Sequence, residues 1–142
     1  MRRYLLRDIA TFAYILLFSF VAASKLMDME KFAAQMRLQP LNASLVPYLI
    51  WGIPIVEVLI VLVLSVPGYR IVGLKLAMGL MLVFTGYISL ANFGYFVNPP
   101  CTCAGVISTF TWNQHLWFNL FFLILGVVAI LPPFEKKSLK LN

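Results

Sequence analysis

The only two cysteines of the 142-residue chain, Cys101 and Cys103, are separated by one residue. Two thiols this close can join only through a small, strained ring, and strained disulfides are the more oxidising and more often catalytic ones. Pro99 and Pro100 stiffen the chain before the pair, and Gly105 after it allows a turn. The pattern indicates thiol–disulfide exchange or metal delivery, with a static bridge or two small buried thiols as the alternative.

A second candidate group for chemistry is the single histidine, His115, which shares a helical face with Trp112 and Asn119. Asn119 lies one turn further along and can fix the tautomer of the imidazole. If this face points toward the cysteines, His115 can stabilise a thiolate or carry its proton. The alternative is an interfacial histidine beside a belt formed by Trp112 and Trp117.

Glu57 is a third candidate, because it falls near the middle of an apolar segment. A carboxyl group at such a depth must face the interior of a helix bundle, either protonated or paired. Pro54 should leave one backbone carbonyl near Glu57 without its helical hydrogen bond. Lys25 and Asp28 are three residues apart and can pair on one helical face, or they can be a snorkelling lysine and an ordinary helix cap.

The elements that position these residues are predicted to lie in a membrane, because 62% of the chain is hydrophobic and only 11% is charged. Residues 76–134 contain no Asp, Glu, Lys or Arg, which is enough for two membrane-spanning helices and a loop. Continuous apolar runs at residues 9–24, 46–66, 71–91 and 114–131 predict four spans in one domain covering residues 1–142. The expected fold is therefore an all-α polytopic membrane protein with a four-helix bundle.

The net charge of +6 is explained by topology rather than by nucleic-acid binding, since eight of the eleven basic residues fall on one side of the predicted spans. These eight are Arg2, Arg3, Arg7, Arg70, Lys75, Lys136, Lys137 and Lys140. The positive-inside rule makes that side cytoplasmic in a bacterial inner membrane, with both termini inside. The cysteine segment would then lie in the periplasm, which permits disulfides.

Two further elements are predicted around the spans. Residues 1–27 resemble a secretory signal, but keeping them gives an even number of spans with both termini on the basic side. After them comes a short amphipathic helix on the outer membrane surface, capped by Asp28 and stopped by Pro40. Its apolar face consists of Met29, Phe32, Ala33 and Met36. In the third span, Gly79 and Gly86 share one face and predict close packing against another helix.

Taken in order, four features resemble the MauE family of methylamine-utilisation membrane proteins, within the DoxX-like group of four-helix membrane proteins. They are Lys25-X-X-Asp28 after the first span, Pro54-X-X-Glu57 in the second, Cys101-Thr-Cys103-Ala-Gly105 in the outer loop, and a fourth span just beyond. The resemblance covers nearly the whole chain. It implies a part in maturing a disulfide-rich partner protein in the periplasm. Ala104 departs from the family pattern, which has an aromatic residue at that position.

The resulting hypothesis is a redox-accessory protein, acting like a thiol–disulfide oxidoreductase, in which Cys101 and Cys103 cycle between dithiol and disulfide. His115 would tune the thiolate, above a polar core of Lys25, Asp28, Glu57 and Asn119. The expected partners are the lipid bilayer, a periplasmic thiol or disulfide protein and a larger membrane complex. No metal is expected. A quinone is a candidate electron acceptor, although no residue demonstrates a quinone site. The alternatives are a structural subunit of an envelope complex and a small-solute transporter built around Glu57.

Overall fold

The computed structural model describes residues 2–96 and 111–131, and every regular element within them is a helix. In chain order these are α1 (Arg2–Met27), α2 (Met29–Arg37), α3 (Val46–Ser65), the 3₁₀ turn η1 (Pro67–Tyr69), α4 (Arg70–Asn92) and α5 (Trp112–Ile130). Four of them, α1, α3, α4 and α5, are long and apolar enough to cross a membrane. The predicted all-α bundle with four spans is confirmed, and α1 extends past both ends of the predicted run because helices continue into polar flanking residues.

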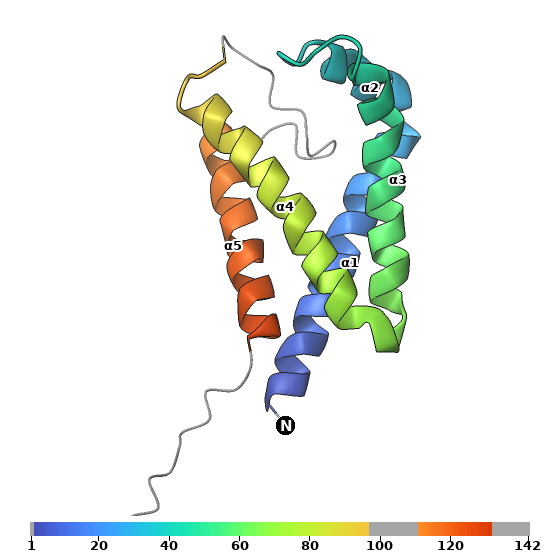
Figure 1. The fold of residues 1–142 in the computed structure, drawn as a ribbon, viewed down its shortest axis with the longest axis vertical. Helices are drawn as coiled ribbons and strands as arrows, with labels where there is room; N and C mark the ends of the chain where they lie inside the picture. Colours follow the sequence, from blue (N-terminus) through green and yellow to red (C-terminus); the bar gives the residue numbers. More distant parts are fainter. Residues whose placement is uncertain (1, 97–110, 132–142) are drawn as a thin grey trace, which may run out of the picture.

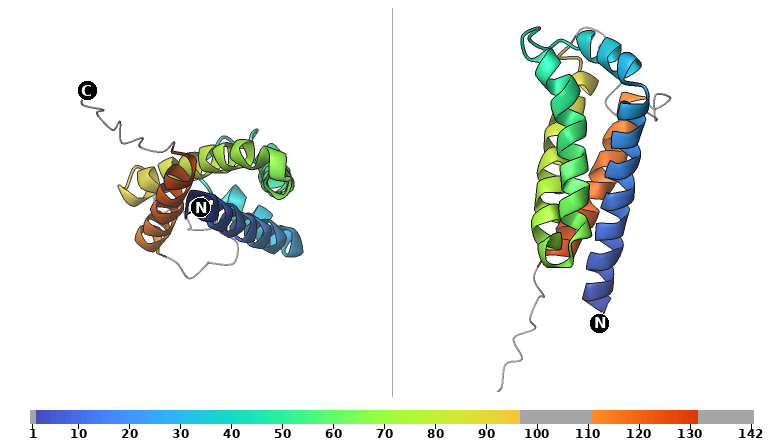
Figure 2. Two further views of the ribbon diagram at one scale, coloured as in Figure 1. Left: turned by 90° about the horizontal axis from the view of Figure 1, so that it is seen from below. Right: turned by 90° about the vertical axis from the view of Figure 1, so that its right-hand side faces the viewer.

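The bundle is built from two closely packed helix pairs (Figure 1). The main partner of α1 is α3, and the main partner of α4 is α5. The short turn η1 connects α3 to α4, so these two helices are antiparallel neighbours. At the end of the bundle opposite the N terminus, α2 lies across the ends of the spans (Figure 2). We call this the α2 end of the bundle, and the other the N-terminal end.

The predicted amphipathic helix is α2. Phe32 and Met36 are buried and pack with Val46 and Ile50 of α3 in a small hydrophobic cluster. Asp28 is the N-cap, and its side chain accepts a hydrogen bond from the Lys31 backbone N–H at 3.2 Å. A cap of this kind satisfies one of the free N–H groups of the first turn.

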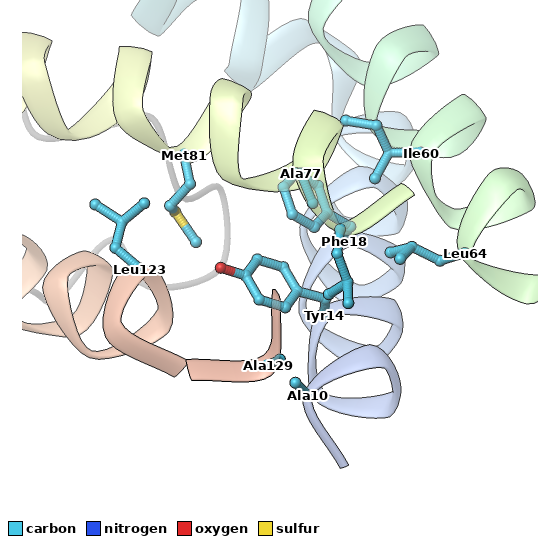
Figure 3. Close-up of a cluster of buried hydrophobic side chains, with 10 residues drawn as sticks. Ala10, Tyr14, Phe18, Ile60, Leu64, Ala77, Met81, Leu123 and Ala129 are labelled. Carbon is cyan, nitrogen blue, oxygen red and sulfur yellow. The ribbon is translucent and has the colours of Figure 1, made fainter. Parts of the chain in front are cut away.

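The larger hydrophobic core surrounds Tyr14 of α1, which is fully buried (Figure 3). Its ring stacks on Phe18 and meets Phe122 edge to face, with centroids 6.2 and 5.6 Å apart. Its hydroxyl donates a hydrogen bond of 2.7 Å to the backbone carbonyl of Phe122. Tyr14 therefore joins α1 to α5 through both apolar and polar contacts, which satisfies the hydroxyl inside a membrane protein.

The helices approach closely at two glycines, but these are not the glycines that the sequence suggested. A Cβ atom on Gly126 would lie 2.8 Å from the Tyr14 hydroxyl and 2.7 Å from Met78, and one on Gly73 would lie 2.8 Å from Leu64. The predicted packing glycines, Gly79 and Gly86, are exposed, and a Cβ atom on either would have no neighbour within 4 Å. That prediction is therefore wrong within this chain, because their face of α4 points away from the bundle.

We expect Gly126→Ala to lower the free energy of unfolding by about 1–3 kcal/mol, the usual cost of overpacking. The added methyl group pushes on the Tyr14 hydroxyl, whose ring cannot move without losing its bond to Phe122. Gly79→Ala is the matched control: its methyl group meets no neighbour, so stability should stay the same or rise by up to about 1 kcal/mol through helix propensity. Thermal unfolding in detergent measures both, and equal losses would show that the space around Gly126 does not limit packing.

At the N-terminal end, Asp8 of α1 accepts a hydrogen bond of 2.9 Å from the Arg70 guanidinium at the start of α4. Both side chains are partly exposed, so the pair adds little stability. It nevertheless explains an acidic residue that is unusual in the charged region of a secretory signal. Together with Tyr14, it makes α1 an integral part of the bundle.

Candidate functional site

The most unusual feature of the bundle is an ion pair in its interior. The ammonium group of Lys25, near the end of α1, donates a hydrogen bond to Oε1 of Glu57 in α3. Only 1% of the Lys25 side chain and none of the Glu57 side chain is exposed. Because charges are rarely buried without a partner, each group needs the other to remain inside the bundle.

Two aromatic rings complete the surroundings of the lysine. Its Nζ lies 5.6 Å from the ring centroid of Phe32 in α2 and 5.7 Å from that of Phe84 in α4. Ring faces attract cations through their quadrupole, and the attraction grows when water is excluded. Lys25 therefore interacts with residues from α2, α3 and α4, and it connects the amphipathic helix to the spans.

Glu57 occupies a polar layer between two apolar ones. The buried residues of α3 run in order from Ile50, in the small cluster with α2, through Pro54 and Glu57, to Ile60 in the large core. The Oε2 atom of Glu57 is buried and has no hydrogen-bond partner in the part of the chain that the structure describes. A carboxylate oxygen in this state is an acceptor still available inside the protein.

His115 belongs to the same region through electrostatics. Its side chain is 5% exposed, and the positive charge of Lys25 acts on its ring. A capping box sets the start of α5: the Gln114 N–H donates to Thr111 Oγ1 at 3.3 Å, and the Thr111 N–H donates to Gln114 Oε1 at 3.1 Å. This box places His115 at the first turn of the helix, with its side chain inward.

Two more polar side chains are buried on the inner faces of α4 and α5. Asn119 of α5, one turn further into the bundle, is 3% exposed. Thr85 of α4 is also buried, and its hydroxyl donates 2.7 Å to the carbonyl of Met81. The interior thus holds a polar region whose members come from all four spans.

At the α2 end, Tyr87 of α4 contacts residues that border the cysteine segment. Its hydroxyl donates a hydrogen bond to Oε1 of the buried Gln39, just after α2. Its ring stacks on Phe96, with centroids 5.6 Å apart, and meets Trp112 edge to face at 6.4 Å. Phe96 is the last described residue before the cysteine segment, and Trp112 is the first of α5. Phe96 and Trp112, which border the cysteine segment, therefore both contact Tyr87.

The structure brings some of the predicted site residues together and not others. Lys25 and Glu57 are in contact, and His115 and Asn119 are buried on α5. Asp28 does not join them: it is exposed, it caps α2, and the partner of Lys25 is Glu57 instead. Cys101 and Cys103 lie outside the described residues. Within residues 2–96 and 111–131, no three His, Cys, Asp or Glu side chains gather as metal ligands.

Sequence reasoning missed Phe84, whose ring contacts Lys25, and three polar residues that are at least partly buried: Thr85, Tyr87 and Gln39. Thr85 carried a signal, because it falls in helical register with the buried positions Ala77, Met81 and Ile88 of α4. Phe84 and Tyr87 gave none, since aromatic residues are common on every face of a membrane helix.

The helices of the bundle coincide with a match to a known protein family. The family model described as "Methylamine utilisation protein MauE" matches residues 3–132, and so includes every helix of the bundle. Comparisons with curated proteins and with solved structures found no match.

Proposed function

Because the chain belongs to the MauE family, we propose that this multi-pass membrane protein is a redox-accessory protein that exchanges thiols and disulfides with a protein partner outside the cytoplasm. As the resemblance to methylamine-utilisation proteins implies, the expected partner is an envelope protein undergoing maturation. The observation that carries the proposal is the contact of Phe96 and Trp112, which border the cysteine segment, with Tyr87 at the end of the bundle where Lys25 and His115 are buried.

Chain connectivity supports a cysteine pair that works at this end. Cys101 follows Phe96 by five residues, so covalent geometry keeps their Cα atoms within about 18 Å. The segment carries no charged side chain, and most basic residues lie toward the other side of the spans. By the positive-inside rule, the cysteines then face the oxidising compartment.

The chemistry assigned to the pair is two successive exchanges. The thiolate of Cys101 attacks a disulfide of the partner, so that one partner sulfur leaves as a thiolate and a mixed disulfide forms. Cys103 then attacks the Cys101 sulfur, which releases the second partner thiolate and leaves a Cys101–Cys103 disulfide. The same steps in reverse oxidise the partner. In that direction the electrons need an acceptor, for which a membrane quinone is the class we name. In the forward direction a dithiol reductant must return the Cys101–Cys103 disulfide to two thiols.

Buried residues of the bundle would assist this exchange by moving a proton and by stabilising negative charge. His115 lies in the first turn of α5 and is the one imidazole able to take or return a thiol proton. The charge of Lys25, held by Glu57 and by two aromatic rings, would favour a nearby anion such as a thiolate. In this role Lys25 and Glu57 are positioning residues.

The proposal predicts that Cys103→Ser accumulates a mixed disulfide between Cys101 and an envelope protein, because no neighbouring thiol remains to resolve it. The adduct is detected as a reducible band on non-reducing gels of acid-quenched cells, and it identifies the partner. Cys101→Ser should accumulate less, since Cys101 is assigned the attack.

Two controls make this test decisive. A maleimide that cannot cross membranes should label the reduced cysteines in intact spheroplasts, and labelling only after lysis would invert the orientation. The Cys101→Ser/Cys103→Ser variant must give no adduct. Absence of any adduct in both single variants would favour the alternative of a structural subunit with an inert cysteine pair.

A further inference from the structure

A groove of about 490 Å³ runs along the membrane-facing side of the bundle between α3 and α4. From α3 it is lined by Val56, Leu59 and Val63, and from α4 by Lys75, Gly79 and Val83. Gly79 contributes no side chain and has no neighbour within 4 Å of its Cβ direction, so the groove is open above it. Its walls are apolar apart from one residue, Lys75.

Lys75 is an exposed cation without an acidic partner among the described residues. The nearest candidate at the N-terminal end, Asp8, is bound by Arg70. Glu57 is enclosed by the bundle with Lys25, and the remaining described acids, Asp28 and Glu30, belong to the α2 end. Lys75 lies five residues into α4, about 7.5 Å along its axis, so its long side chain can reach the headgroup region.

We propose that this groove binds an anionic phospholipid, whose phosphate pairs with Lys75 and whose acyl chain lies along the groove over Gly79. From Lys75 to Val83 the groove follows about 12 Å of helix. One leaflet of a bilayer has about 15 Å of hydrocarbon, so one chain of a lipid in the leaflet at the N-terminal end matches the length. Basic residues at the edges of membrane helices recognise such headgroups.

Charge favours a lipid over a second copy of the chain. A helix of a second copy would cover Lys75 with another apolar surface. It would offer no free carboxylate at the N-terminal end, because the described acid there, Asp8, is bound by Arg70. The C-terminal tail has one acid, Glu135, and three lysines, so it repels a cation overall. An anionic lipid supplies both the apolar chain and the negative charge. This inference does not depend on the proposed redox role.

The test is a titration of the purified full chain with phosphatidylglycerol and, separately, with phosphatidylcholine, followed by native mass spectrometry. We expect saturable binding that prefers phosphatidylglycerol. Lys75→Gln should weaken binding of phosphatidylglycerol about fivefold and remove the preference. Gly79→Leu, which fills the groove, should weaken both lipids.

Matched variants serve as controls. Gly86→Leu places the same side chain at an exposed glycine of α4 outside the groove, and Lys31→Gln removes an exposed cation at the α2 end; both should bind like the parent. Equal binding of the two lipids by the parent, or unchanged binding by both groove variants, would overturn the proposal. Loss of a dimer in Gly79→Leu, with lipid binding unaffected, would overturn it in favour of a second copy.

Discussion

The Glu57→Lys variant is expected to fail to accumulate as folded protein in the membrane. It would place a second ammonium group in direct contact with Lys25, in a site from which water is excluded. Glu57→Gln is expected to fold less stably than the parent by about 3–5 kcal/mol, because it leaves the Lys25 charge buried without its counter-ion. Fluorescence-detected size exclusion measures the accumulated protein, and thermal unfolding in detergent measures the stability of Glu57→Gln.

A double replacement separates the ion pair from simple loss of packing. Lys25→Met/Glu57→Met exchanges both charges for apolar groups of comparable size, and such exchanges are often neutral or stabilising. We therefore expect the double variant to be more stable than either Lys25→Met or Glu57→Met alone. If its loss equalled the sum of the single losses, the two charges would not be coupled. A stable double variant that no longer forms the mixed disulfide with its partner would give the pair a positioning role beyond stability.

The Cys101→Ser/Cys103→Ser variant is expected to lose thiol–disulfide exchange completely and to keep the stability of the parent within about 0.5 kcal/mol. A disulfide across one intervening residue restricts almost no loop, whereas one closing a 15-residue loop contributes roughly 3 kcal/mol in the chain-entropy model. The measurements are thermal unfolding in detergent and the redox state of the partner that the single variants trap.

The opposite pattern would favour the rival hypothesis. If the double serine variant unfolded readily while its folded fraction retained cellular function, the cysteine pair would be structural, and the chain would be better described as a scaffold for an envelope complex. The third hypothesis, a transporter built around Glu57, predicts loss of solute uptake in the apolar Lys25→Met/Glu57→Met variant. Uptake assays on that folded variant separate transport from redox function.

The number and order of helices could be read from the sequence because long apolar runs interrupted by charges leave few alternatives in a membrane. The short helix α2 was equally accessible, since its apolar residues recur with helical spacing. Its packing against α3 was not part of that prediction. Which side of each span faces the bundle could not be predicted from the sequence in this way. Both the lipid-facing and the bundle-facing sides are apolar, so Gly79 and Gly86 could be assigned to a common face but not to the correct side.

The candidate site was predicted in its residue types but not in its pairing. Spacing along the chain suggests partners within one helix turn, so it offers Asp28 either as a partner of Lys25 or as an ordinary helix cap, and the structure shows the cap. Its actual partner, Glu57, is 32 residues away and becomes a neighbour only because α1 and α3 pack side by side. A buried carboxylate in one span and a lysine at the end of another are complementary charges, but the helix pairing that joins them is a property of the folded bundle.

The ion pair also has a consequence for biogenesis. A carboxylate at the centre of a helix opposes transfer from the translocon into lipid by about 2.5–3.5 kcal/mol. Lys25 is synthesised 32 residues before Glu57, so α1 can wait beside the exit site and neutralise α3 as it emerges. We expect α1 and α3 to enter the bilayer together as a preassembled hairpin, with α4 and α5 added to it afterwards.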